Sequence, residues 1–292
     1  MDLLAISVGN SRTQLGRFTG TELDSSERIS NQHPDLILSR AIEHWGHLGE
    51  NSRGIALASV NESVAGPLAK ALKARLGADV SRLGADLGIP VGTCLDEGAK
   101  PGTDRLLNAA AAWDKFQCAT VVIDAGTAVT VDFVDGKGVF QGGAIAPGVA
   151  LQLRAMHDGT AGLPLVAPAA PTDEPFGKCT EQAMLQGVHH GIRGLVQRLV
   201  ERYAEAYGAF PRVIATGGDA EALFAEDDVV EMVDADLTLH GIAAAVAAAS
   251  GTAKSQGRRS AGVAAAPVPH KHDGGCCGHD HGTDGGCCGH QH

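Results

Sequence analysis

Positive charge is in short supply in this chain of 292 residues. Lys and Arg number 23 against 34 Asp and Glu, so the formal net charge is -11. A protein that binds nucleic acid without a special motif would show a basic face. We therefore expect no nucleic-acid partner. Phosphate groups are not excluded, because glycine loops and helix N-termini can bind them on an acidic protein.

Long apolar runs are also missing. No stretch approaches the ~18 residues that cross a bilayer, so no membrane partner is expected. The opening MDLLAISVGN becomes polar too quickly for an export signal. These two absences predict a cytoplasmic protein. Aromatic residues make up only 4% of the chain, and the scattered Cys94, Cys118 and Cys179 are interpreted as small buried hydrophobes.

The hydrophobic content of 44% is enough to build a sizeable core. Two stretches share one plan: LLAISVGNSRTQLGRF and VVIDAGTAVTVDFV each contain an apolar strand, a small polar turn and a second strand. This echo predicts two related α/β halves, residues 1–116 and 117–250. A further strand is expected at 53–60 and a strand, glycine turn and helix at 212–224. Helices are expected at 34–45, 65–77, 104–116, 182–207 and 237–250.

Three motifs in this body could carry chemistry. In IDAGTAVTVD, Asp124 and Asp132 flank a turn whose Gly126 and Thr127 could face phosphate oxygens, although a simple capped hairpin fits equally well. In PGTDR, Asp104 could be a general base and Arg105 an anion clamp, or the pair could be a helix cap with a surface ion pair. The glycine turn in ATGGDA, residues 215–220, suits either close approach of a ligand or tight packing.

Together, VGNSR, GTDR, DAGTAVTVD, GGAIAPG with TAGLP, CTEQAMLQG and TGGDA resemble the type III pantothenate kinases, from Leu3 to Ser250. The resemblance implies two ribonuclease H-like halves of the acetate-kinase, sugar-kinase, Hsp70 and actin type. It implies transfer of the ATP γ-phosphate to the hydroxyl of pantothenate, which begins coenzyme A synthesis. It also implies a homodimer that binds pantothenate near the subunit interface. Mg²⁺ would accompany ATP, together with a monovalent cation, K⁺ or NH4⁺.

The resemblance also assigns roles to single residues. Asp104 matches the proton acceptor, and Asp124 matches a ligand of the monovalent cation. Thr127 matches an ATP contact in the second turn. The substrate loop would consist of Gly102, Thr103, Asp104 and Arg105, with Thr180 as a further pantothenate contact. The ATP contacts of the first hairpin would be Ser7, Val8, Gly9, Asn10, Ser11, Arg12, Thr13 and Gln14.

Ser7 departs from the family pattern Asp-x-Gly-Asn-Thr. A carboxylate there would hold hydrated Mg²⁺ against the phosphates, whereas a serine brings no charge. Loss of one such group costs about 3 kcal/mol of barrier, or about 10²-fold in rate. Gln14 stands where the family often has lysine. Alternatives to a pantothenate kinase are a catalytically impaired, kinase-like binding or regulatory protein, or a kinase for another small alcohol.

The composition changes near Gly251. Residues 251–272 are predicted to be a linker and residues 273–292 a disordered tail made of the repeated units DGGCCGHDH and DGGCCGHQH. Thiolates together with imidazoles suit zinc, copper(I) or nickel. The alternative is an idle polar tail. The candidate metal ligands are Cys276, Cys277, His279, His281, Cys287, Cys288, His290 and His292.

Overall fold

The computed structural model describes residues 1–49 and 52–251. The first sheet has the order β3-β2-β1-β4-β5 and consists of β1 (Asp2–Val8), β2 (Arg12–Thr19), β3 (Glu22–Ser30), β4 (Arg53–Ser59) and β5 (Val80–Arg82). The first three strands are antiparallel neighbours, and β4 and β5 continue the sheet in parallel.

The second sheet repeats this topology. Its strands are β7 (Thr120–Ala125), β8 (Ala128–Val134), β9 (Val139–Pro147), β10 (Arg212–Thr216) and β11 (Met232–Val233). The order β9-β8-β7-β10-β11 is again three antiparallel neighbours followed by two parallel strands. A short extra strand, β6 (Gly92–Thr93), joins the edge at β9. The internal echo in the sequence therefore corresponds to a duplicated fold.

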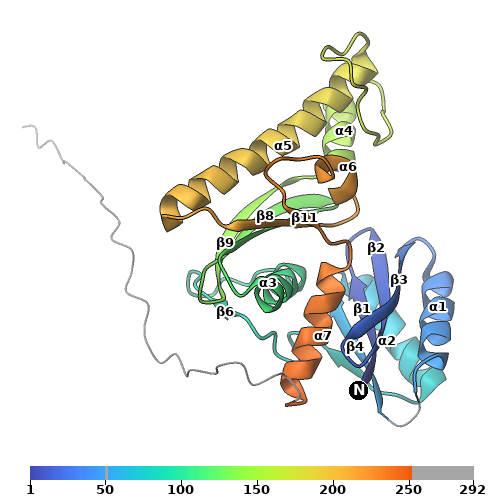
Figure 1. Ribbon diagram of the computed structural model, residues 1–292. Helices are drawn as coiled ribbons and strands as arrows, with labels where there is room; N and C mark the ends of the chain where they lie inside the picture. Colours follow the sequence, from blue (N-terminus) through green and yellow to red (C-terminus); the bar gives the residue numbers. More distant parts are fainter. Residues whose placement is uncertain (50–51, 252–292) are drawn as a thin grey trace, which may run out of the picture. The chain divides into compact units, whose positions relative to one another are not determined.

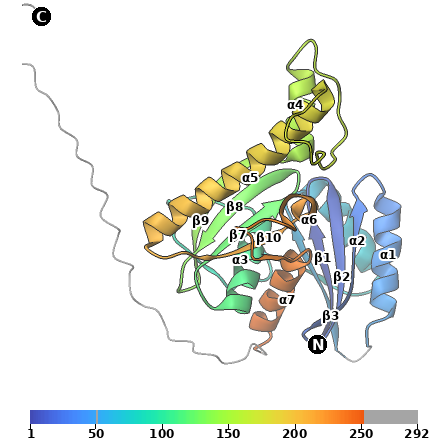
Figure 2. The same ribbon diagram turned by 45° about the horizontal axis from the view of Figure 1, so that its top comes forward.

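The helices form three layers around the two sheets (Figures 1 and 2). α1 (Pro34–Gly46) and α2 (Glu62–Leu76) cover the outer face of the first sheet. α3 (Thr103–Phe116) and α7 (Leu237–Ala249) pack between the sheets. α4 (Val149–Asp158), α5 (Thr180–Tyr207) and α6 (Ala220–Phe224) lie on the outer face of the second sheet.

Alternation along the strands creates these layers. Leu4, Ile6 and Val8 of β1 pack under α1 and α2, whereas Leu3 and Ala5 point to α7. Successive side chains of a strand point to opposite faces, so a strand buried on both faces is a continuous apolar run. This is why β1 and β7 were recognisable from the sequence.

Some elements differ from expectation. The sequence does not predict β3, because its residues ELDSSERIS lie at the sheet edge, are mostly polar, and include only one buried side chain, Ile29. α2 begins at Glu62 rather than at residue 65, and Pro67 lies inside it. The division of the halves at residue 116 stays a prediction. The tail and all of the linker except Gly251 lie outside the described residues.

The cysteine interpretation was wrong for two of its three residues. Cys94 and Cys179 are exposed, and Cys118 is partly buried. Cys94 follows the edge strand β6, and Cys179 is the residue before α5, so neither lies within a packed element. Among the described residues, no helix is long and apolar enough to cross a membrane.

Candidate functional site

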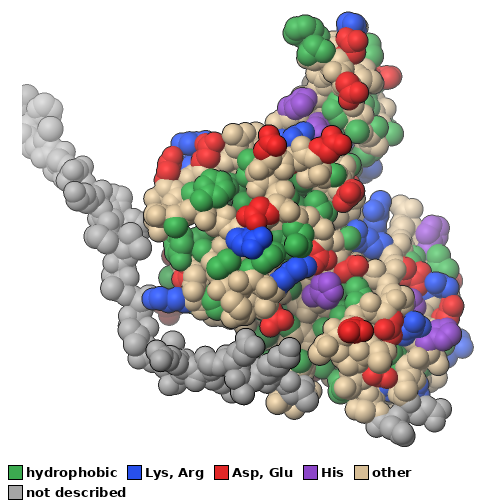
Figure 3. Space-filling view, in the orientation of Figure 1, with side chains coloured by type: hydrophobic (Ala, Val, Ile, Leu, Met, Phe, Trp, Pro, Cys, Tyr) green, Lys and Arg blue, Asp and Glu red, His purple; other side chains and the backbone are tan. Residues whose placement is uncertain are grey.

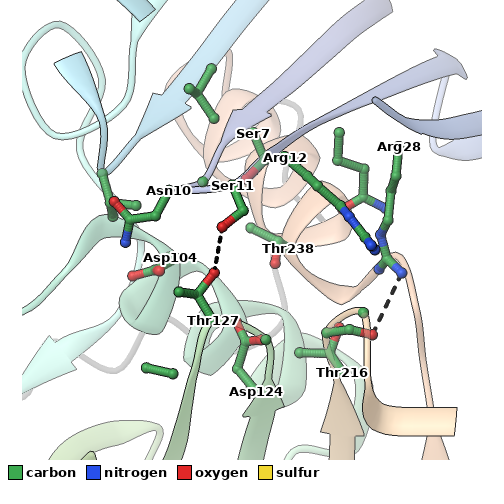
Figure 4. Close-up of a pocket in the computed structure, with 18 of the residues that line it drawn as sticks. Ser7, Asn10, Ser11, Arg12, Arg28, Asp104, Asp124, Thr127, Thr216 and Thr238 are labelled. Carbon is green, nitrogen blue, oxygen red and sulfur yellow. Dashed lines mark hydrogen bonds between the residues drawn. The ribbon is translucent and has the colours of Figure 1, made fainter. Parts of the chain in front are cut away.

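A cavity of about 390 Å³ lies where the two sheets face each other across α3 and α7 (Figure 4). The turns that follow β1, β7 and β10 all reach it, as does the first turn of α3. Its polar lining includes two arginines, three aspartates and several hydroxyl groups: Ser7, Asn10, Ser11, Arg12, Gln14, Arg28, Ser59, Asp104, Asp124, Thr127, Thr130, Thr216, Asp219 and Thr238.

The two hairpin turns face one another in this cavity. In the first, the Gly9 amide donates to the Arg12 carbonyl at 3.0 Å; in the second, the Gly126 amide donates to the Ala128 carbonyl, also at 3.0 Å. The hydroxyls of Ser11 and Thr127 are hydrogen bonded at 2.9 Å, so the turns touch directly. Small residues leave the turn backbone open to a ligand.

Asn31, at the end of β3, fixes the first turn. Its amide nitrogen donates to the carbonyls of Gly9 at 2.9 Å and Asn10 at 3.2 Å, and its oxygen accepts from Thr13 at 2.8 Å. The Thr13 side chain is thus buried behind the turn rather than in the cavity. Sequence reasoning missed Asn31, because it is far from the turn along the chain.

Asp104 lies in the first turn of α3 and lines the cavity. One carboxylate oxygen accepts the Arg105 amide at 2.8 Å, and the other has no hydrogen-bond partner among the described residues. A Cβ added at Gly102 would come within 2.5 Å of the Asp104 carboxylate. Gly102 therefore leaves the space that this carboxylate occupies, although it does not itself line the cavity.

Asp124, at the end of β7, is held by a chain of polar groups. Asn108 of α3 donates to it at 3.1 Å, and Thr238 of α7 donates to Asn108 at 2.7 Å. Burial and the nearby Asp104 raise the pKa of Asp124 to about 6. Its second oxygen has no hydrogen-bond partner among the described residues, which fits a cation ligand. Neither Asn108 nor Thr238 was singled out from the sequence.

Arg105 points away from the cavity. Its Nε donates to both carboxylate oxygens of Asp132, at 3.1 and 3.0 Å, and the side chains are 15% and 3% exposed. The ion pair ties the start of α3 to β8, inside the fold rather than at the surface. Asp132 is therefore the ion-pair partner of Arg105. Unlike Asp124, it does not line the cavity beside the turn. A substrate contact by Arg105 stays a prediction.

The remaining predicted residues divide into two groups. Ser7, Val8, Gly9, Asn10, Ser11, Arg12, Gln14 and Thr127 line the cavity together with Asp104 and Asp124. Thr103 and Thr180 do not line it. Thr180 is exposed at the start of α5 and borders a separate hollow between α4 and α5, next to Met156 and Met184. The Gln14 amide is bound to Asp236 at 2.7 Å.

Solved structures share this architecture. A Campylobacter jejuni protein described as a Baf family transcriptional activator matches with a TM-score of 0.55 and 22% identity, over 85% of this chain and 99% of that one. An activator of 2-hydroxyisocaproyl-CoA dehydratase from Clostridium difficile, with bound ADPNP, matches with a TM-score of 0.52 and 15% identity, over 89% and 100%. The duplicated ribonuclease H-like halves define an actin-like ATPase fold.

Sequence comparison gives the narrower assignment. The type III pantothenate kinase model matches residues 3–202. A type III pantothenate kinase of Pelobacter propionicus is 36% identical over 82% of this chain and 96% of its own length. One of Rhodospirillum rubrum is 47% identical over 54% of this chain, a match that spans 61% of that relative. The chain belongs to the type III pantothenate kinase family.

Proposed function

We propose that this chain phosphorylates pantothenate with ATP, the reaction that opens coenzyme A synthesis. Family membership supports the reaction class. The observation that carries the proposal is the Asp104 carboxylate beside the paired turns. One of its oxygens is fixed by a backbone amide, and the other has no hydrogen-bond partner in the described part of the chain. The same cavity would hold ATP.

In this scheme Asp104 accepts the proton of the pantothenate hydroxyl as that oxygen bonds to the γ-phosphorus. The bond from the γ-phosphorus to the β,γ-bridging oxygen breaks, and ADP leaves. A general base must be fixed within hydrogen-bond reach of the proton it removes. The backbone amide of Arg105 holds the carboxylate in place, and the absence of a side chain at Gly102 leaves room for it. The turns containing Ser11 and Thr127 would position the phosphates, since positioning accounts for most catalysis of phosphoryl transfer.

The cations of this reaction would have different protein ligands. Mg²⁺ would travel with ATP and be held chiefly by phosphate oxygens and water, which suits its preference for few protein ligands. Among the described residues no three His, Cys, Asp or Glu side chains gather as a ready-made metal site. Asp124 has one carboxylate oxygen without a hydrogen bond from the residues that the structure describes, and it is our candidate ligand for K⁺ or NH4⁺.

The test is pantothenate phosphorylation followed by mass spectrometry, with ATP, MgCl₂ and KCl. We expect product from the native chain and a loss of at least about 10²-fold in kcat for Asp104→Asn. ATP binding, measured by calorimetry, should survive in that variant. Preferential phosphorylation of another small alcohol would contradict the assignment of pantothenate as the substrate. A native chain that binds ATP but transfers nothing would favour the binding or regulatory role.

We also propose that the protein acts in the cytoplasm as a dimer of two identical chains. In this dimer, Thr180 would contribute to pantothenate binding at the interface between the subunits. Exposed apolar side chains support an interface near the hollow that Thr180 borders: Ile145, Leu151, Leu165 and Phe176. Figure 3 shows apolar side chains exposed at this projecting end of the molecule. Analytical ultracentrifugation of the native chain and of Phe176→Asp would test this, with a monomeric native chain as the contrary result.

For the tail, we propose binding of zinc, nickel or copper(I) through its repeated Cys and His residues. The support is the sequence pattern, which gives each unit two potential thiolates and two imidazoles. Equilibrium dialysis followed by elemental analysis should find bound metal in the full chain. Replacement of Cys276, Cys277, Cys287 and Cys288 by serine should remove most of it. Equal metal content in both proteins would contradict the proposal.

A further inference from the structure

Two arginines from the first sheet reach the same turn of the second sheet. Arg28 of β3 donates to the carbonyl of Gly217 at 3.5 Å and to that of Ala235. Arg12 of β2 approaches so closely that a Cβ at Gly218 would be 3.1 Å from its Nη1. Figure 4 shows both guanidinium groups on one side of the cavity, with Asp104 on the other.

Arg28 lies in the same cross-strand row as Ser7. Ser7 pairs with Gln14 of β2, and Gln14 pairs with Arg28, so the three residues stand side by side across the sheet. All three line the cavity. Neighbouring strands are about 4.8 Å apart, which puts the Ser7 and Arg28 backbones about 10 Å from each other. A long arginine can therefore reach the space that a carboxylate at position 7 would face.

Among the described residues, no acidic side chain forms an ion pair with Arg12. The Arg12 side chain is exposed and forms no hydrogen bond or ion pair among the described residues. Burial raises the pKa of the Asp219 carboxyl, and the positive charge of Arg12 partly offsets this rise, although the two side chains form no ion pair in the described part of the chain. Within the described residues, the Arg28 guanidinium donates only to carbonyl groups, and its charge partly offsets the rise in the pKa of Asp124. Two cations that converge on one cavity wall repel each other, and an anion bound between them would offset that repulsion.

We propose that Arg12 and Arg28 bind the polyphosphate of the nucleotide directly, and that this chain therefore binds ATP without depending on a divalent cation. The proposal rests on the function proposed above and specifies how its nucleotide is held. Guanidinium groups bind phosphate through strong charge-assisted hydrogen bonds. The cross-strand row of Ser7, Gln14 and Arg28 explains why no divalent cation would be needed. At position 7 this chain has a serine in place of a metal-binding carboxylate, and the guanidinium group of Arg28 brings positive charge to the same wall of the cavity.

Calorimetric titration of the full chain with ATP tests this, once in EDTA and once in MgCl₂. We expect ATP to bind in EDTA within about tenfold of its affinity in MgCl₂. Arg12→Gln should weaken binding in EDTA by about 10- to 100-fold, the range expected for a charge-assisted hydrogen bond. Arg28→Gln should do the same, and Arg28→Lys should retain part of the affinity. Adenosine, which has no phosphate, should bind all these proteins equally.

Arg75→Gln is the matched control. It removes the same charge at the far end of α2, about 20 Å along the helix from Val60 at the cavity rim. Ser7→Asp should reverse the preference, so that ATP binds more weakly in EDTA and gains at least about tenfold from Mg²⁺. No binding in EDTA, or unchanged binding by a folded Arg12→Gln protein, would overturn the proposal. Failure of pantothenate phosphorylation with these binding results intact would overturn the proposed function instead.

Discussion

Ser7 and Asp124 occupy equivalent places in the two halves of the molecule. Each lies two residues before the glycine that closes a strand turn, Gly9 in the first half and Gly126 in the second. The second half has a carboxylate at this place and the first half a hydroxyl. The two halves therefore differ at this turn, which is acidic in the second half and neutral in the first. Near the neutral turn, the cavity is lined by the positively charged Arg12 and Arg28.

Asp124 should make stability depend on pH and on monovalent cations. Its pKa is raised from 3.8 to about 6, so between these values the folded state holds a proton that the unfolded state has lost. The contribution of Asp124 to the free energy of unfolding therefore falls as the pH rises from about 4 to about 6. Above pH 6 this loss of stability is complete and remains constant. Its upper limit is about 3 kcal/mol, at about 1.4 kcal/mol for each pKa unit.

We therefore expect Asp124→Asn to melt at a higher temperature than the native chain at pH 7.5 in choline chloride, and the difference to shrink at pH 4.5. Replacing choline by K⁺ should also shrink it at pH 7.5, because a bound cation stabilises the carboxylate. Differential scanning calorimetry at both pH values checks this. If the difference in melting temperature between the two proteins changed neither with pH nor with K⁺, Asp124 would be excluded as a cation ligand.

Arg105 should behave mainly as a structural residue. Arg105→Gln leaves the Asp132 carboxylate buried without its guanidinium partner, at a cost of about 3–5 kcal/mol in the free energy of unfolding. Urea denaturation of the variant measures this loss. The double variant Arg105→Leu with Asp132→Leu should recover part of the stability, because no buried charge remains. Undiminished stability of Arg105→Gln together with a raised KM for pantothenate would support a substrate contact.

At the scale of elements, β3 is the strand that completes the site. Its residue Arg28 lines the cavity, and Asn31 at its end fixes the first turn. Asn31→Ala should cost about 1–3 kcal/mol of stability through lost hydrogen bonds and should raise the KM for ATP more than that for pantothenate. Gln32→Ala is the control, since that side chain is exposed and makes no hydrogen bond to any residue that the structure describes. Equal effects of both variants would exclude the proposed fixation.

At the scale of the whole molecule, the site exists only where the two sheets meet. A nucleotide in this cavity would contact turns of both sheets and so stabilise both halves together. At a hundred times its Kd, ATP adds about 2.7 kcal/mol to the stability of the folded state. For a domain of this size the melting temperature should rise by about 5–10 °C. Two separate melting transitions, of which ATP moves only one, would contradict this.

The duplicated plan, most helices, the residues of the two turns and Asp104 can be predicted from the sequence, because their signals are local: apolar strands, glycine turns and a helix start. The residues that surround them follow only from the packing of distant segments. Two of these residues, Arg28 and Thr238, line the cavity, and the other two, Asn31 and Asn108, form hydrogen bonds to residues that line it. All four come from segments that are distant from the two turns along the chain. Arg105, adjacent to Asp104, turns instead to Asp132, because successive residues of a helix point in different directions.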